Sequence, residues 1–130
     1  MSNTFETVTR GIRITVQPEY MPDRSDPAAD NYLFAYHITI RNEGKEPVKL
    51  VSRHWIITDG SGREEQVRGP GVVGEQPHLD PGDGFRYSSA CPLSTPVGSM
   101  QGSFQMETDT GEQFDARIAP FTLASPGTLH

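Results

Sequence analysis

The residues best suited to chemistry are three glycines, Gly69, Gly71 and Gly74, which follow Arg68 in the segment RGPGVVG. Their spacing matches the G-x-G-x-x-G pattern of dinucleotide sites, where a helix begins behind the glycines and binds pyrophosphate at its N-terminus. Pro77 and Pro81 exclude such a helix here. A structural loop is therefore the favoured interpretation. As the weaker alternative, the loop amides form an anion nest, to which Arg68 adds charge.

A second group, His78, Asp80 and Asp83 in the segment HLDPGD, combines an imidazole with two carboxylates. Such groups ligate divalent metals, so these residues are the candidate metal site, but the segment lacks the D-x-D-x-D-G pattern of a calcium loop. Asp residues are also common in turns, and that interpretation is favoured. His37 and His54 lie far away along the chain and contribute only if the fold brings them near.

Arg53, His54 and Trp55 form a cationic and aromatic cluster, which would suit an interaction surface if it were exposed. In the alternative, Trp55 belongs to the core and Arg53 lies at a sheet edge. The apolar residues at both parities of this strand favour the alternative.

Catalytic residues are not identifiable. Cys91 has no neighbouring basic residue that would lower its pKa, and no G-x-S-x-G segment is present. Glu64 and Glu65 are adjacent, so a strand would point them to opposite faces. We therefore predict a protein that is not an enzyme and uses no cofactor.

The elements that must position these residues are strands. Apolar residues alternate with polar ones over several short segments, and turn residues separate the segments. The spacing predicts about seven strands in an all-β, immunoglobulin- or fibronectin type III-like antiparallel β-sandwich, with a closed barrel as the competing architecture. Residues 69–84, rich in Gly and Pro, are predicted to be a rigid connection between neighbouring strands. The predicted strands are 8–16, 32–41, 48–59, 64–68, 85–91, 100–106 and 114–118.

Length and charge limit the classes of function. The 130 residues fit one domain, 1–130, with flexible tails at 1–7 and 124–130. The net charge is −6 and the basic residues are scattered, which argues against nucleic acid as a ligand. The apolar runs are too short for membrane insertion. A single cysteine and the lack of a signal-peptide pattern predict a cytoplasmic location.

The segments SRHWIITDGSG, VRGPGVVGEQPHLDPG and FRYSSACPLSTPVGSMQGSFQM, together with GEQF at 111–114, resemble the ApaG family over residues 8–123. The resemblance implies a fibronectin type III-like sandwich and an association with cobalt tolerance and magnesium efflux. The resemblance also implies that related domains occur in F-box proteins and in a polymerase-interacting protein. This use within larger proteins implies an interaction module with an unidentified protein partner, and free sheet edges would also permit a homodimer. The alternatives are a nucleotide or pyrophosphate binder at 69–74 and a direct divalent-metal binder.

Overall fold

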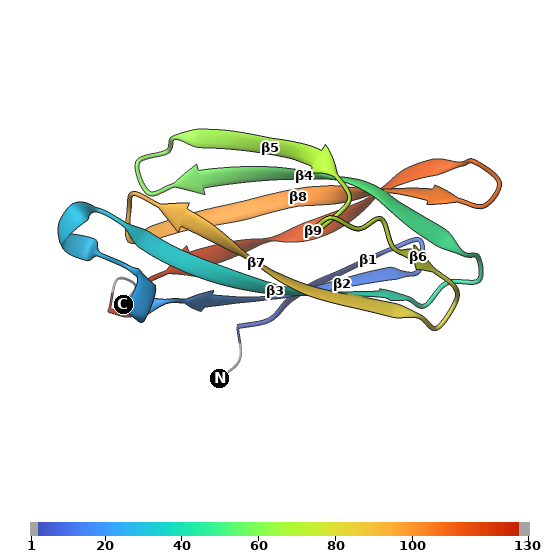
Figure 1. Ribbon diagram of the computed structural model, residues 1–130, viewed down its shortest axis with the longest axis horizontal. Helices are drawn as coiled ribbons and strands as arrows, with labels where there is room; N and C mark the ends of the chain where they lie inside the picture. The colour runs from blue at the N-terminus through green and yellow to red at the C-terminus, as the bar shows by residue number, and fades with distance from the viewer. Residues whose placement is uncertain (1–2, 128–130) are drawn as a thin grey trace.

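Two antiparallel sheets pack face to face in the computed structural model, which describes residues 3–127 (Figure 1). One sheet has the strand order β1-β2-β3-β7. The other has the order β5-β4-β8-β9, and the short β6 also pairs with β4. The strands are β1 (Phe5–Thr9), β2 (Ile12–Tyr20), β3 (Tyr32–Asn42), β4 (Val48–Asp59), β5 (Glu64–Pro70), β6 (His78–Leu79), β7 (Gly84–Leu93), β8 (Val97–Thr108) and β9 (Gln113–Ala124), with two 3-10 turns, η1 (Pro22–Arg24) and η2 (Pro27–Ala29), between β2 and β3.

The predicted antiparallel β-sandwich is confirmed, but the structure has nine strands instead of about seven. The segment 8–16, predicted as one strand, is a hairpin whose turn residues Arg10 and Gly11 have φ angles of 49° and 81°. The alternating pattern of apolar residues did not reveal this turn, because it counted Val8 as a core residue. In the structure, Val8 lies on the outside of the sandwich and is 50% exposed. The two-residue β6 is too short to give a periodic pattern.

The N-terminal prediction also requires correction. Residues 5–7 were expected to be part of a flexible tail, yet they form β1 and pair with β2 from Phe5↔Val16 onward. The ring of Phe5 lies 6.0 Å from that of Phe121, centroid to centroid, and this contact fixes the strand against the other sheet. At the other end, Ala124 is the last residue of β9, and the predicted tail positions 1–2 and 128–130 lie outside the described residues.

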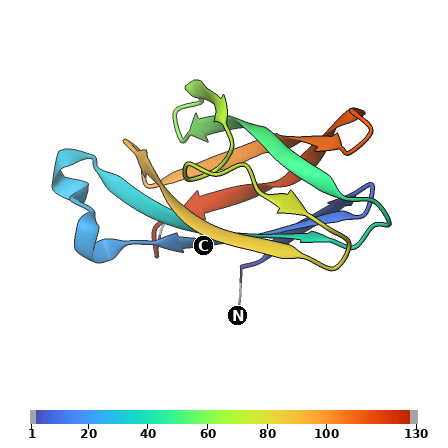
Figure 2. The ribbon, with the colours of Figure 1, turned by 45° about the vertical axis from the view of Figure 1, so that its right-hand side comes forward.

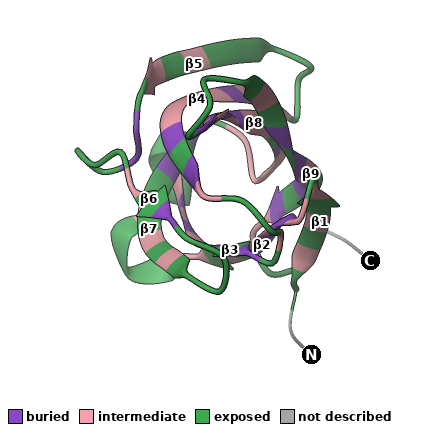
Figure 3. Cartoon of the chain, turned by 90° about the vertical axis from the view of Figure 1, so that its right-hand side faces the viewer, coloured by how far each residue is buried: buried purple, intermediate pink, exposed green. Residues whose placement is uncertain are grey.

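The core lies between the sheets, where the buried residues of both gather (Figure 3), and Trp55 belongs to it. Its side chain is only 2% exposed, which confirms the core interpretation. The indole ring contacts Tyr36 from one sheet and Phe104 and Phe121 from its own, at centroid distances of 5.3, 6.3 and 6.0 Å. Burying one large apolar side chain stabilises a fold by about 1.5–3 kcal/mol. Trp55 therefore links the two sheets.

The two sides of the sandwich differ. On one side, β1 lies beside β9, where the Thr7 hydroxyl donates to the Arg117 carbonyl and the Arg117 amide donates to the Thr9 hydroxyl. On the other side, β5 and β7 are the outermost strands of their sheets and each pairs with one neighbour only (Figure 1). The sandwich is thus closed at β1 and β9 and open at β5 and β7.

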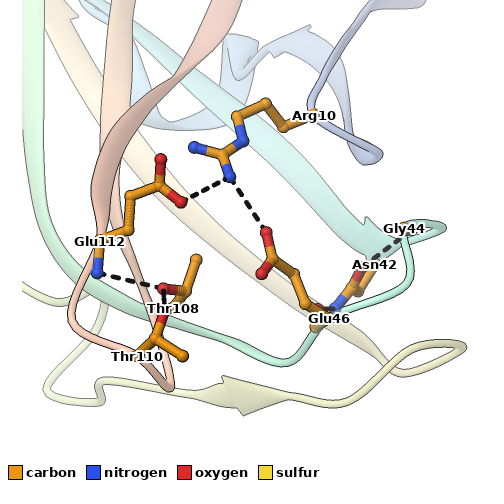
Figure 4. Close-up of polar contacts among 7 residues, drawn as sticks. All are labelled: Arg10, Asn42, Gly44, Glu46, Thr108, Thr110 and Glu112. Atoms are coloured by element: carbon orange, nitrogen blue, oxygen red, sulfur yellow. Dashed lines mark hydrogen bonds and ion pairs between the residues drawn. The ribbon is translucent and has the colours of Figure 1, made fainter.

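At one end of the sandwich, Arg10 joins three connections that are distant in sequence (Figure 4). Its Nη2 lies 3.1 Å from Glu46 Oε1, in the β3–β4 connection, and 2.9 Å from Glu112 Oε1, in the β8–β9 turn. The guanidinium also lies 4.6 Å above the ring of Phe114. The ion pair with Arg10 lowers the pKa of the Glu112 carboxyl.

Asn42, at the end of β3, supports the same end from inside and is 1% exposed. Its Nδ2 donates to the carbonyl oxygens of Glu46 and Leu79 at 2.8 and 3.0 Å, while its Oδ1 accepts from the Gly44 amide at 2.9 Å. A buried side-chain amide costs little when its polar atoms are paired in this way. Asn42 therefore ties the β3–β4 connection to β6.

Across residues 3–127, no helix is long and apolar enough to cross a membrane.

Candidate functional site

The glycine-rich segment after β5 is anchored by Arg53 of β4. Arg53 Nη1 donates to the carbonyl oxygens of Pro70 and Gly71, each at 3.0 Å. Gly69 is paired with Arg53 in the β4–β5 ladder, and a Cβ atom at Gly69 would lie 2.8 Å from the guanidinium nitrogens. A side chain at Gly69 would therefore displace the Arg53 guanidinium from its place beside these carbonyls.

The next residues form a tight turn in place of the helix that a dinucleotide site needs. The Val72 and Glu75 amides each donate to the other residue's carbonyl, at 2.8 and 2.9 Å. Between them, Val73 and Gly74 have φ angles of 44° and 82°, the arrangement of a type I′ turn. Because residues 71–77 contain no helix, the pyrophosphate site of a dinucleotide fold is not formed.

This turn inserts an apolar side chain into the open side of the sandwich. Val72 is 0% exposed and belongs to the core. Gly71, with φ of 57°, donates its amide to the Val51 carbonyl at 2.8 Å, and a Cβ atom there would lie 2.1 Å from the Glu75 carbonyl oxygen. The segment then crosses to β6 and on to β7 in the opposite sheet, so residues 69–84 connect the two sheets and not neighbouring strands (Figure 2).

The cluster Arg53, His54 and Trp55 does not form one interaction surface. Trp55 is buried in the core, and Arg53, on the same face of β4, is committed to the loop carbonyls. Only His54 points to the outer face, where its Nε2 lies 2.9 Å from Gln66 Oε1. The alternation of β4 thus separates three residues that are consecutive in sequence.

A groove of about 620 Å³ lies on the outer face of the β5-β4-β8-β9 sheet. A second hollow of about 240 Å³ adjoins it, and His54 and Asp115 line both. The polar side chains of the larger groove come from five segments of the chain: Ser52, Arg53 and His54 of β4, Arg68 of β5, Gln76 of the loop after β5, Gln105 of β8 and Asp115 of β9. The smaller hollow adds Arg117.

Two cations of this surface have no opposing charge. Among residues 3–127, neither Arg68 nor Arg117 has a carboxylate oxygen within 4.0 Å. Asp115 is the one carboxylate that lines the two hollows, and its Oδ1 accepts a 3.3 Å hydrogen bond from Gln105. The surface therefore carries net positive charge on a protein whose overall charge is −6.

Sequence reasoning found Arg68, Gly69 and His54 but missed the groove residues of β8 and β9. Ser103 and Gln105 alternate with buried Phe104 and Met106, so their outward direction could be read from the pattern. That Ser103 and Gln105 lie near Arg68 could not be read from the sequence, because this proximity depends on the strand order β5-β4-β8-β9.

The His78, Asp80 and Asp83 group is assembled differently from a metal site. His78 Nε2 lies 3.0 Å from Asp109 Oδ1 in the β8–β9 turn, and its Nδ1 lies 3.7 Å from Asp80 Oδ1. The Asp83 carboxylate accepts from the Asp80 amide at 3.0 Å, as in a turn. In the part of the chain that the structure describes, no group of three His, Cys, Asp or Glu side chains is arranged to hold a metal ion.

The carboxylates around His78 change its protonation. The hydrogen bond that the His78 imidazole donates to the Asp109 carboxylate is the main cause that raises the pKa of His78, and the charges of Asp80 and Asp83 add to it. The imidazole therefore joins β6 to the β8–β9 turn most strongly when it is protonated.

Cys91 is buried between the sheets and is 3% exposed. Burial raises the pKa of its thiol to about 11, so the thiolate is scarce at neutral pH. Glu64 and Glu65 are both exposed on β5 and alternate between its two faces. Neither arrangement is a nucleophile or an acid/base pair.

Known proteins resemble this chain over almost its whole length. A family model described as the ApaG domain matches residues 22–108. "Protein ApaG" of Mesorhizobium japonicum is 54% identical over 124 residues, which are 95% of each chain. "Protein ApaG" of Anaeromyxobacter dehalogenans is 52% identical over 123 residues, 95% of this chain and 97% of that protein. The crystal structure of the putative ApaA protein from Bordetella pertussis is 47% identical, with a TM-score of 0.88, and the match covers 94% of this chain and 100% of that one.

The glycine turn gives a matched pair of substitutions. Gly71→Ala should lower the free energy of unfolding by about 3 kcal/mol or more, because left-handed strain of about 1–2 kcal/mol is added to a clash with the Glu75 carbonyl. Gly74→Ala meets nothing within 4 Å and should cost only the strain. Urea unfolding of both variants measures the difference, and equal losses would contradict this account of Gly71.

The His78 contacts predict a pH-dependent contribution to stability. Because the folded-state pKa is raised, the stabilisation is complete below the ordinary pKa of about 6.5 and is lost as pH rises through the folded value. Asp109→Asn should lower the pKa of His78 more than Asp80→Asn does. An NMR titration of the His78 ring in the three proteins tests this, and an unchanged pKa in Asp109→Asn would refute it.

Proposed function

The chain belongs to the ApaG domain family, and from that premise we propose that it is a non-enzymatic binding module. Its ligand is an acidic segment of a protein partner, held in the groove over β4 and β5 and in the adjoining hollow toward β9. The observation that carries the proposal is a groove of about 620 Å³ lined by polar side chains of five segments.

Charge favours an acidic ligand. Arg68 and Arg117 lie on this surface without carboxylate partners among the described residues, and His54 lies between them on the strand order. An Arg side chain binds a carboxylate through two parallel hydrogen bonds, which fix the geometry of the pair as well as its charge. Because the protein has a net charge of −6, attraction of an acidic segment must be local to this surface.

Binding is favoured over catalysis because the groove lacks a reactive pair. Its polar groups are a hydroxyl, an imidazole, amides, two guanidinium groups and one carboxylate, and His54 Nε2 is already bonded to Gln66. Ser52 Oγ donates to Gln105 Oε1 at 2.8 Å and is not bonded to a base. The single thiol, Cys91, is buried in the core.

A nucleotide or another phosphorylated ligand is the second candidate, because Arg68 and Gly69 line the same groove. The turn gives it limited support: the Gly71, Val72 and Glu75 amides already donate to backbone carbonyls. A phosphate near this turn would have to rely on Arg68 and on the amides of Val73 and Gly74.

We propose that the protein takes part in cobalt tolerance and magnesium efflux, as its family resemblance implies, indirectly and in the cytoplasm. A partner bound in the groove would connect it to ion transport. Direct metal binding by His78, Asp80 and Asp83 is less favoured, because no three potential ligands within residues 3–127 are arranged to hold an ion. A net charge of −6 disfavours nucleic acid as the partner.

The groove is tested by site-specific photocrosslinking in a bacterial lysate. A crosslinking amino acid at Ser103, on the outer face of β8, should capture a defined partner that the same group at Thr39, on the outer face of the other sheet, does not. The double variant His54→Glu, Arg117→Glu should abolish this product, because it replaces attraction of an acidic segment by repulsion.

The matched control is His37→Glu, Arg86→Glu, which places the same changes on the outer face of β3 and β7. Thermal unfolding should show that both double variants remain folded. Equal capture by both would contradict the proposal. A titration with nucleotides, followed through the amide signals of residues 68–75, separates the second candidate: shifts in these signals would favour it over the protein segment.

A further inference from the structure

The edge of β5 presents a defined set of backbone groups to solvent. At one end of the β4–β5 ladder, the Asp59 amide donates to the Arg63 carbonyl, and beyond the other end the Gly71 amide donates to the Val51 carbonyl. Both β5-side residues are odd-numbered. Since N–H and C=O directions alternate along a strand, the odd-numbered residues of this segment face β4.

The even-numbered residues of β5 therefore direct their N–H and C=O groups away from β4. These residues are Glu64, Gln66 and Arg68, and all three are exposed. No other strand within residues 3–127 pairs with this edge, and β5 is the outermost strand in Figures 1 and 3. Pro70, the last residue of the strand, has no N–H, so the open donor row ends at Arg68.

The charges on this edge are arranged symmetrically about Gln66. Glu64 precedes it by two residues and Arg68 follows it by two, so both side chains lie on the outer face of the sheet. Glu64 receives a 3.4 Å contact from Gln66 Nε2, but neither charge has an opposite charge within 4.0 Å among the described residues.

We propose that a second copy of this chain pairs with β5 in antiparallel fashion, about a two-fold axis at Gln66. In this register Gln66 lies opposite Gln66 of the second copy, and Glu64 lies opposite Arg68 of the second copy, twice by symmetry. All three pairs use the outward N–H and C=O groups, so each is a hydrogen-bonded pair of the new ladder. The two sheets become one continuous sheet across the dimer.

Backbone and charge select the same register. A two-fold axis at Val67 would place Glu64 opposite Pro70, which lacks a donor, and Arg68 opposite Gln66, so that no charges match. The other open edge, β7, has Arg86 as its single charged residue between Gly84 and Leu93 and cannot match charges with itself. β5 is thus the edge whose chemistry fits a second copy, because opposite charges stabilise directly opposed strand positions.

Sedimentation velocity over a range of protein concentrations at low, fixed salt tests the dimer. Arg68→Glu and Glu64→Arg should each weaken association by roughly tenfold in Kd, because each single reversal creates two like-charge pairs. The double variant Glu64→Arg, Arg68→Glu should restore association, since the swapped charges again face each other. Arg86→Glu on β7 is the control and should leave the Kd unchanged.

Gln66→Pro is the second, independent variant. It removes an outward N–H and the side-chain contact with His54, but none of the backbone bonds to β4. Proline is tolerated at such edge positions, so the fold should persist while association is lost. A protein that stays monomeric up to about 1 mM would overturn the proposal. So would a dimer that neither Arg68→Glu nor Gln66→Pro weakens. The groove proposal is tested by substitutions at His54 of β4 and Arg117 of β9, and the dimer proposal by substitutions on β5. Either proposal can therefore fail without the other.

Discussion

The burial of Trp55 is the interaction on which the rest of the structure depends. Its ring contacts both sheets and thereby fixes which face of β4 is turned inward. Because side chains alternate, an inward Trp55 places Arg53 on the inner face and His54 on the outer one. The loop anchored by Arg53 and the groove beside His54 are therefore two results of a single packing event. A one-residue slip of β4 would exchange the two faces and abolish both.

The glycine-rich segment shows how a motif can be explained without a ligand. Gly69 leaves room for the Arg53 guanidinium, Gly71 for the Glu75 carbonyl, and Gly74 completes a left-handed turn. Each glycine thus has its own steric or conformational reason. Together they place Val72 in the core at the open side, where the sheets would otherwise leave apolar surface exposed.

The fold was largely predictable because strand alternation is a local signal. The long strands β3, β8 and β9 were recovered from it, whereas β4 and the core position of Trp55 were inferred from apolar residues at both parities of the strand. The β1–β2 turn was not, because Arg10 adopts a positive φ that is uncommon for a residue with a side chain. The groove was only half predictable: Arg68 and His54 stood out by residue type, whereas Gln105 and Asp115 became their neighbours through strand order, which no local pattern encodes.

The contrast between the closed and open sides also has a practical consequence. The strands nearest the chain ends, β1 and β9, lie together on the closed side, whereas β5 lies on the opposite one. A linker attached at either end would leave the chain on the flank remote from β5. Immobilisation on a sensor chip through either end, or fusion to another folded unit there, would thus orient the molecule with the open edge of β5 toward the bulk solution.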